Sequence, residues 1–94
     1  MAQVSSRVIV TVIGQDRVGI IAGVARLLAD AGVNIVDISQ TLLQEMFTMI
    51  MMVDVSKAAV PFDELRQRLK AHGESLGLAI DAQHEDVFRF MHRV

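Results

Sequence analysis

The segment with the strongest potential for ligand chemistry is Gly14-Gln15-Asp16-Arg17-Val18-Gly19-Ile20. Its two glycines bracket a short loop that leads into a predicted helix, and the N–H groups and dipole at a helix N-terminus favour an anion such as a carboxylate. A second interpretation requires no ligand: Asp16 caps the helix, and the glycines permit the turn and close packing. General physical chemistry favours this second interpretation, which predicts that Asp16→Ala costs about 1 kcal/mol of stability.

Asn34 has a similar ambiguity. It follows Gly32, where the helix is expected to end because glycine adopts a left-handed terminal conformation at the least cost. Asn34 is then either a turn residue or a polar group that hydrogen-bonds a ligand. Residue types alone leave both interpretations open.

Residue patterns typical of catalysis or metal binding are missing from the sequence. It has no cysteine, no Gly-x-Ser-x-Gly motif and no phosphate-binding Gly-x-x-x-x-Gly-Lys-Ser/Thr loop. His72, His84 and His92 fall in three different predicted segments and lack the spacing of metal ligands. Asp37 and Glu45 are separated by a strand and a turn, so we interpret them as solvated or ligand-orienting carboxylates rather than an acid/base pair. We therefore predict a non-enzymatic protein without a metal or a cofactor.

Length and composition indicate one self-associating domain. The 94 residues fit a single domain over residues 1–94, with a core over about residues 7–84. Hydrophobic residues other than glycine make up 52% of the chain, which is above the average for a globular protein. A core of this size is marginal for a lone chain, so we expect a homodimer or a higher homo-oligomer.

Charge and hydropathy argue against two classes of partner. The net charge is −2, the basic residues are dispersed, and the aromatic rings come from four Phe alone, so we expect no nucleic-acid partner. No apolar stretch approaches the roughly 18 residues needed to cross a bilayer, so we expect no membrane partner. The N-terminus lacks the pattern of a secretory signal, and we expect the protein to be cytoplasmic.

Hydropathy patterns predict a single string of short elements. Four runs that are rich in β-branched residues, or alternate between apolar and polar ones, predict strands, and the middle two are close enough for an antiparallel hairpin. The predicted strands cover residues 7–13, 34–43, 47–55 and 78–82. Apolar spacings of three and four predict a helix from Gly19, and Pro61 is expected as the first residue of a second helix. Residues 86–94 are expected to add a short C-terminal helical extension.

The order of these elements predicts an α+β fold, the ferredoxin-like βαββαβ unit, with a four-stranded antiparallel sheet and two helices on one face. The other face of the sheet lacks a cover, so we expect association through that face or edge to edge. Four methionines lie in or beside the third predicted strand, and the alternation of a strand prevents them all from facing one side. They are Met46, Met49, Met51 and Met52.

Several motifs bear a family resemblance. The run Val-Ile-Gly-Gln-Asp-Arg-Val-Gly-Ile-Ile-Ala-Gly-Val over 12–24, followed by Ala-Asp-Ala-Gly-Val-Asn-Ile over 29–35, resembles the ACT domain, a small regulatory module that binds amino acids. The continuation Asp-Ile-Ser-Gln-Thr over 37–41 and Phe-Thr-Met over 47–49 resembles the stand-alone ACT proteins of the UPF0237 group, which are related to the glycine cleavage repressor. The resemblance spans essentially the whole chain.

The resemblance implies a ligand held between the loop of one copy and a neighbouring strand or subunit. Carried over to this chain, the implied site residues are Gly14, Asp16, Arg17, Gly19 and Ile20 in the loop, and Asn34 and Ile35 at the second predicted strand. In such a site, loop N–H groups bind the carboxylate of the ligand, and oxygens of Asp16 or Asn34 bind its ammonium group. Val18 stands where many relatives have proline, which makes the loop less stiff here.

Two functions from different classes follow from these patterns. The first is a non-enzymatic regulatory domain that self-associates and binds a small amino acid. The second is a structural module that binds an unknown protein partner through its apolar sheet surface and has no small-molecule ligand. An RNA-recognition domain or an acylphosphatase-like enzyme of the same topology is disfavoured, because the chain is acidic, offers only Phe47 on the relevant strands and lacks the required loop pattern.

Overall fold

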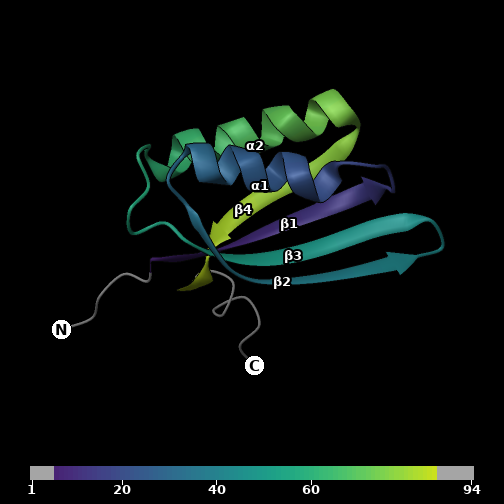
Figure 1. Cartoon of the computed structure of the whole chain (residues 1–94), viewed down its shortest axis with the longest axis horizontal. Coiled ribbons are helices and arrows are strands. Elements are labelled where there is room, and N and C mark those ends of the chain that lie inside the picture. The colour runs from purple at the N-terminus through teal and green to yellow at the C-terminus, as the bar shows by residue number, and fades with distance from the viewer. Residues whose placement is uncertain (1–5, 87–94) are drawn as a thin grey trace.

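Four strands and two helices in the predicted order make up the computed structural model, which describes residues 6–86 (Figure 1). The elements are β1 (Arg7–Gln15), α1 (Ile20–Asp30), β2 (Asn34–Leu43), β3 (Met46–Asp54), α2 (Phe62–Leu76) and β4 (Leu78–His84). Neighbouring strands are antiparallel in the order β2-β3-β1-β4, and both helices cover the same face of the sheet (Figure 1). The predicted ferredoxin-like fold is confirmed. The predicted C-terminal extension lies outside the described residues beyond Asp86.

The core lies between the sheet and the two helices. Every second residue of the central strands β1 and β3 points toward the helices and is fully buried, as the alternation of a strand requires. These strand residues are Val8, Val10, Val12, Met49, Met51 and Val53. They meet Leu28 of α1 and Leu65 and Leu69 of α2, which are also fully buried. This packing holds both helices at defined positions over the two central strands.

The methionines of β3 lie on both faces of the sheet, as the alternation predicts. Met49 and Met51 belong to the core, whereas Met52 lies on the opposite face, where its sulfur is 3.8 Å from Arg7 Nη1. Met46, at the start of the strand, is exposed. Methionine therefore fills the core at two positions and contributes to the outer surface at the other two.

The element boundaries differ from the predictions by one or two residues. β1 continues past Ile13 to Gln15 and β4 past Ala82 to His84, because these residues find pairing partners on neighbouring strands. Pro61 is not the first residue of α2 but the residue before it, since its ψ of 156° is extended rather than helical. β3 begins and ends one residue earlier than predicted.

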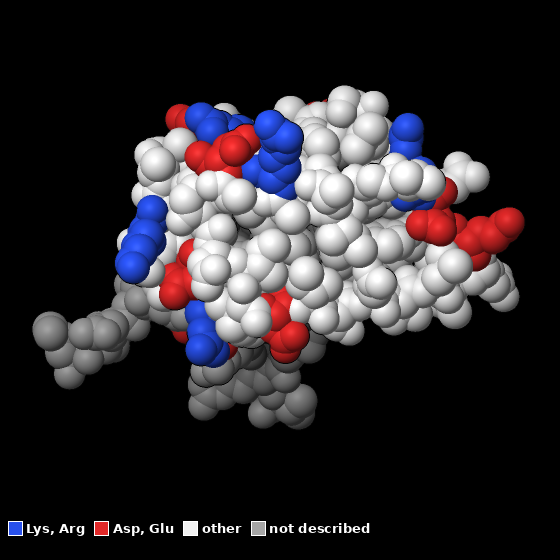
Figure 2. All heavy atoms as spheres, in the orientation of Figure 1, with Lys and Arg blue, Asp and Glu red and all other residues white. Residues whose placement is uncertain are grey.

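Among residues 6–86, no element covers the second face of the sheet, and the edge strands β2 and β4 each have one unpaired side. β2 forms one edge, and its side chains Ile38, Leu42 and Leu43 are 40%, 59% and 67% exposed. Ile13 and Ile50, on the uncovered face of the central strands, are also exposed. Along the β2–β3 hairpin, up to its turn, the surface is largely uncharged (Figure 2). Apolar surface is therefore available to a partner along β2.

Candidate functional site

The loop between β1 and α1 begins just after Gly14 and Gln15, at a point where β1 and β4 approach each other closely. Gly14 pairs with Phe47 of β3 on one side and with Leu78 of β4 on the other. A Cβ atom at Gly14 would lie 2.5 Å from Leu78 Cδ2 and 3.2 Å from Leu78 Cα, which is closer than ordinary packing allows. Because Gly14 has no side chain, Leu78 at the start of β4 can pair with β1 at this position, just before the loop.

Helix α1 begins at a glycine and has no side-chain cap. Gly19 is the N-cap residue with φ of 90°, a left-handed conformation that favours glycine, and the Gly23 amide donates a hydrogen bond to its carbonyl (2.9 Å). No side chain caps the helix, so the prediction that Asp16 is the cap is wrong. The Asp16 amide instead donates a hydrogen bond to the Glu45 carbonyl (3.3 Å) in the β2–β3 turn. The N–H groups of the first helical turn are thereby left to solvent or to a ligand.

A hollow of about 360 Å³ opens at this end of α1. Its lining comes from the loop, from the first turn of α1 and from the β2–β3 hairpin. The lining residues are Asp16, Arg17, Gly19, Ile20, Ile21, Ala22, Gln40 and Phe47. Four of the seven residues implied by the resemblance, namely those from Asp16 to Ile20, therefore share one hollow.

Gln40 and Phe47 are lining residues that the sequence interpretation did not include. Gln40 lies in β2 opposite Met49, on the side of the sheet that faces the helices. Phe47, in β3, is 8% exposed and belongs to the core. Alternation along the strand indicates the face on which Gln40 lies. Only the register of the hairpin against the loop brings Gln40 into the same hollow as Asp16.

The charged groups around the hollow have different partners. Arg17 Nη1 donates a hydrogen bond to the Leu76 carbonyl (3.2 Å) at the C-terminus of α2, where the helix dipole favours a cation. Arg17 therefore links the loop to α2. Acidic side chains gather at the same end of the molecule, beside the tip of the β2–β3 hairpin (Figure 2). Carboxylates in this position favour a ligand that carries an ammonium group.

Three implied residues do not line this hollow: Gly14 lies in β1 just before the loop, whereas Asn34 and Ile35 lie at the opposite end of the sheet. β1 and β2 are both antiparallel to β3, so they run in the same direction, and the end of β1 is distant from the start of β2. Asn34 lines a second hollow of about 330 Å³, whereas Ile35 packs against the core. In that hollow the Ser56 amide donates a hydrogen bond to Asp54 Oδ1 (2.8 Å) and lowers the pKa of this carboxyl. One chain therefore does not bring all seven implied residues together.

The described part of the chain has neither a cluster of metal ligands nor a membrane-spanning helix. Among residues 6–86, no three side chains of His, Asp or Glu are placed to hold a metal ion together. Neither helix of these residues combines the length and the apolar character needed to cross a bilayer.

Comparison with known proteins assigns the family. Residues 6–83 match the family model of the ACT domain. The chain belongs to the ACT domain family. This ACT domain is 53% identical over 89 residues to a UPF0237 protein of Methanocaldococcus jannaschii, and the match covers 95% of this chain and 99% of the relative. The resemblance to the UPF0237 group is thereby confirmed over nearly the whole length of both proteins.

Solved structures show the same relationship. An ACT domain protein from Streptococcus pneumoniae superposes with a TM-score of 0.78 at 42% identity, over 89% of this ACT domain and 94% of that chain. A protein assigned as a glycine cleavage system transcriptional repressor superposes with a TM-score of 0.72 at 27% identity, over 82% of this ACT domain and 44% of that chain. The ACT domain therefore corresponds to somewhat less than half of that repressor.

Proposed function

We propose that this ACT domain is a non-enzymatic regulatory protein that self-associates and binds a small amino acid at the hollow between the β1–α1 loop and the β2–β3 hairpin. The observation that carries the proposal is that α1, which follows the N-cap residue Gly19, has no side-chain cap and opens onto this hollow. Uncapped N–H groups at a helix N-terminus favour a carboxylate. The Asp16 carboxylate in the same lining is a partner for an ammonium group. The same hollow therefore offers N–H groups for the carboxylate of an amino acid and the Asp16 carboxylate for its ammonium group.

The size and lining of the hollow support the same ligand class. A volume of about 360 Å³ is at the small end of ligand pockets, which run from roughly 300 to 1,000 Å³. Gln40 offers an amide that both donates and accepts hydrogen bonds, and Phe47 offers an apolar wall. A small polar molecule with a short side chain fits these dimensions better than a nucleotide does.

Association through the β2 edge would add Asn34 to this site. Two copies related by a two-fold axis pair their β2 strands antiparallel, so the start of each strand lies at the end of the other. Asn34 of the second copy then comes to the β2–β3 turn of the first, whose Glu45 carbonyl is bonded to the loop amide of Asp16. The two groups of implied residues, which one chain holds at opposite ends of its sheet, meet in such a dimer.

The side chains of β2 favour one register for this pairing. With Gln40 opposite Gln40 of the second copy, Ile38 lies opposite Leu42 on the helix-facing side and Ser39 lies opposite Thr41 on the other. Apolar groups then pair with apolar groups and hydroxyls with hydroxyls. Sliding one strand by two residues would set Ile38 opposite Gln40. An apolar group would then face an amide, so this register is less favourable.

Thermal unfolding in the presence of amino acids tests the ligand. A ligand at 100 times its dissociation constant stabilises a protein by about 2.7 kcal/mol when it binds only the folded state. We expect one of the twenty amino acids, or a small group of related ones, to raise the unfolding midpoint by several degrees at millimolar concentration. Differential scanning fluorimetry over a concentration series measures the shift.

Two variants connect this shift to the proposed site. Asp16 forms no cap and Asn34 is exposed, so we expect Asp16→Ala and Asn34→Ala to change the stability without ligand by less than about 0.5 kcal/mol and to abolish the shift. Glu74→Ala, on the exposed side of α2, is the control that keeps the shift. No shift with any amino acid would contradict the proposed ligand. The alternative function, a module for an unknown protein partner, would then be favoured.

Charge exchange at Gln40 tests the dimer and its register. Gln40→Glu places two carboxylates opposite each other, and Gln40→Lys places two ammonium groups opposite each other. We expect either change to raise the dimer dissociation constant about five-fold at low salt. An equimolar mixture of the two variants is expected to restore association, because unlike charges then face each other. Sedimentation velocity over a concentration series measures all three samples.

The matched control for charge exchange is Gln67, an exposed residue of α2. The same two substitutions at Gln67 are expected to leave association unchanged. A wild-type protein that stays monomeric would contradict the dimer. A mixture of the Gln40 variants that associates no better than either variant alone would contradict the register.

A further inference from the structure

The two free edges of the sheet share a local feature. On β2, the Ile38 amide donates a hydrogen bond to Asp37 Oδ1 (2.8 Å), and on β4 the Ala82 amide donates one to Asp81 Oδ1 (2.7 Å). Each amide is bonded to a carboxylate of its own strand rather than to a neighbouring strand, so each lies on the free side of an edge. Free edge amides are the groups that bond to an added strand.

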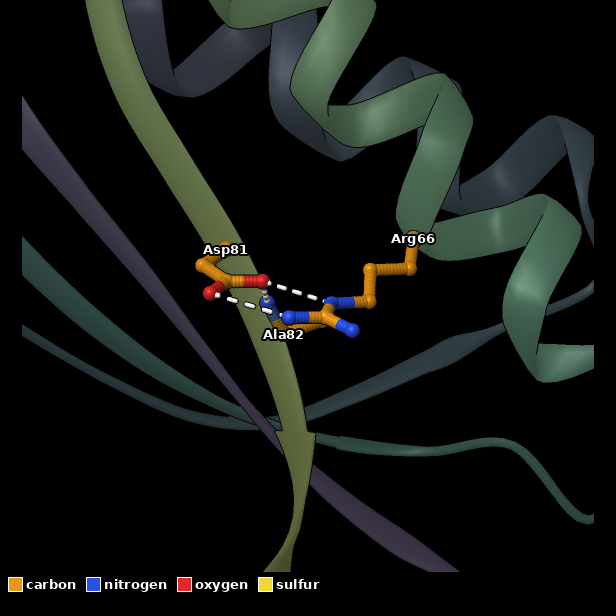
Figure 3. A network of polar contacts seen from close by, with 3 residues as sticks. All are labelled: Arg66, Asp81 and Ala82. Carbon is orange, nitrogen blue, oxygen red and sulfur yellow. Dashed lines mark hydrogen bonds and ion pairs between the residues drawn. The ribbon is translucent and has the colours of Figure 1, made fainter.

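The two carboxylates differ in how they are held. Arg66 of α2 donates two hydrogen bonds to Asp81, from Nε to Oδ1 (2.8 Å) and from Nη2 to Oδ2 (3.4 Å) (Figure 3). The hydrogen bond from Arg66 lowers the pKa of Asp81, so this carboxyl is charged at neutral pH. Asp37 forms no ion pair within residues 6–86. The Asp81 carboxylate at the β4 edge is therefore held by Arg66, whereas the Asp37 carboxylate at the β2 edge has no such partner among residues 6–86.

Apart from the Arg66–Asp81 ion pair, which we call the clamp, the β4 edge has an apolar groove beside which a further strand could pair. A groove of about 380 Å³ beside β4 is lined from β1, β4 and α2. Ile13, Leu78 and Ile80 supply apolar side chains to this lining, and Asp81 lies in it as well. The apolar lining reaches both faces of the sheet, since Ile13 lies on the uncovered face whereas Leu78 and Ile80 lie on the helix-facing side. Side chains of an added strand alternate between the two faces, so they meet apolar groups on either side of this edge. The clamp thus stands at an edge that is otherwise suited to pairing.

We propose that the Arg66–Asp81 pair closes the β4 edge to strand addition by the β2 edge of a second copy of the chain. This inference rests on the proposed self-association through β2. β2 fits as the added strand because it is exposed along its length and carries Ile38 and Leu42, which match the apolar lining beside β4.

The clamp decides how far association can proceed. Pairing of β2 with β2 is two-fold symmetric, so it uses up both β2 edges and stops at a dimer. Pairing of β2 with β4 leaves a free β2 at one end and a free β4 at the other, so it continues into an open chain of sheets. With the β4 edge closed, only the dimer forms.

Two substitutions remove the clamp in different ways. Asp81→Ala takes the carboxylate away from the Ala82 amide, and Arg66→Gln removes the cation and keeps most of its stem. In sedimentation velocity over a concentration series, the wild type is expected to stop at the dimer. Both variants are expected to form larger species, with a weight-average mass roughly two-fold or more above the wild type at the highest concentration. Glu64→Ala is the matched control, because it breaks the ion pair with Arg68 on the same helix and leaves β4 untouched.

The outcomes separate this inference from the proposed dimer. Larger species that dissociate on dilution and unfold cooperatively support the clamp. If both variants keep the mass distribution of the wild type, or if Arg66→Gln forms only irreversible aggregates without cooperative unfolding, the clamp is overturned. A monomeric wild type whose variants associate supports the clamp and contradicts the β2 dimer.

Discussion

Leu28→Ala is expected to lower the free energy of unfolding by about 3 kcal/mol, within the range for large-to-small substitutions in a core. Leu28 lies in α1, is completely buried and belongs to the cluster that joins both helices to the sheet. Truncation to Ala removes apolar contacts and leaves a cavity that the neighbouring side chains fill only in part. Urea denaturation at a fixed protein concentration measures the loss.

Leu42→Ala is the matched control, because it removes the same atoms from the β2 edge. Leu42 is 59% exposed, so the free energy of unfolding of the monomer is expected to change by less than about 0.5 kcal/mol. In the proposed dimer Leu42 faces Ile38 of the second copy, and its truncation is expected to weaken association instead. Equal destabilisation of the monomer by Leu28→Ala and Leu42→Ala would contradict the described core.

Gly73→Val is expected to cost about 3 kcal/mol, at the upper end of the usual range for overpacking. Glycine inside a helix is normally less favourable than a residue with a side chain, so the substitution would otherwise be expected to help. A Cβ atom at Gly73 would lie 2.7 Å from the Leu78 carbonyl oxygen and 2.9 Å from Ile80 Cγ1. Valine therefore forces α2 away from β4. The midpoint of urea unfolding reports this loss.

Ala71→Val provides the comparison for Gly73→Val. Ala71 is exposed on the same helix, so the new valine meets solvent there and costs less than about 0.7 kcal/mol through its lower helix propensity. If Gly73→Val is no more destabilising than Ala71→Val, the close approach of α2 to β4 is contradicted. Arg66 lies on the same helix and contacts Asp81 of β4, so Gly73→Val is also expected to weaken this ion pair.

Most of the fold could be predicted because its signals are local. The β-branched run over 7–13 indicated a strand, and the short connection between β2 and β3 indicated a hairpin. Apolar residues on both faces of β1 did not indicate which face the helices cover. The errors fell at element ends. Gln15 and His84 extend their strands because residues on other strands pair with them, and no property of the local sequence reports such partners.

The candidate site could be predicted only in part. Asp16 and Arg17 line one hollow, and their closeness follows from their adjacency in the chain. The cap prediction failed because the left-handed Gly19 starts the helix three residues later, while the Asp16 amide is bonded to the β2–β3 turn. The separation of Asn34 from the loop follows from topology, since a strand-helix-strand crossover sets β1 and β2 in the same direction.

The sequence by itself determined the order of the elements and the membership of the ACT family, because these depend on residue types at short spacings. Only the tertiary structure decided that Gln40 lines the same hollow as Asp16, and that Arg66 forms an ion pair with Asp81. The physical reason is that these groups come from different elements. Their contacts depend on the register of the sheet and on the distance at which each helix packs against it, and both quantities are set by the whole core at once.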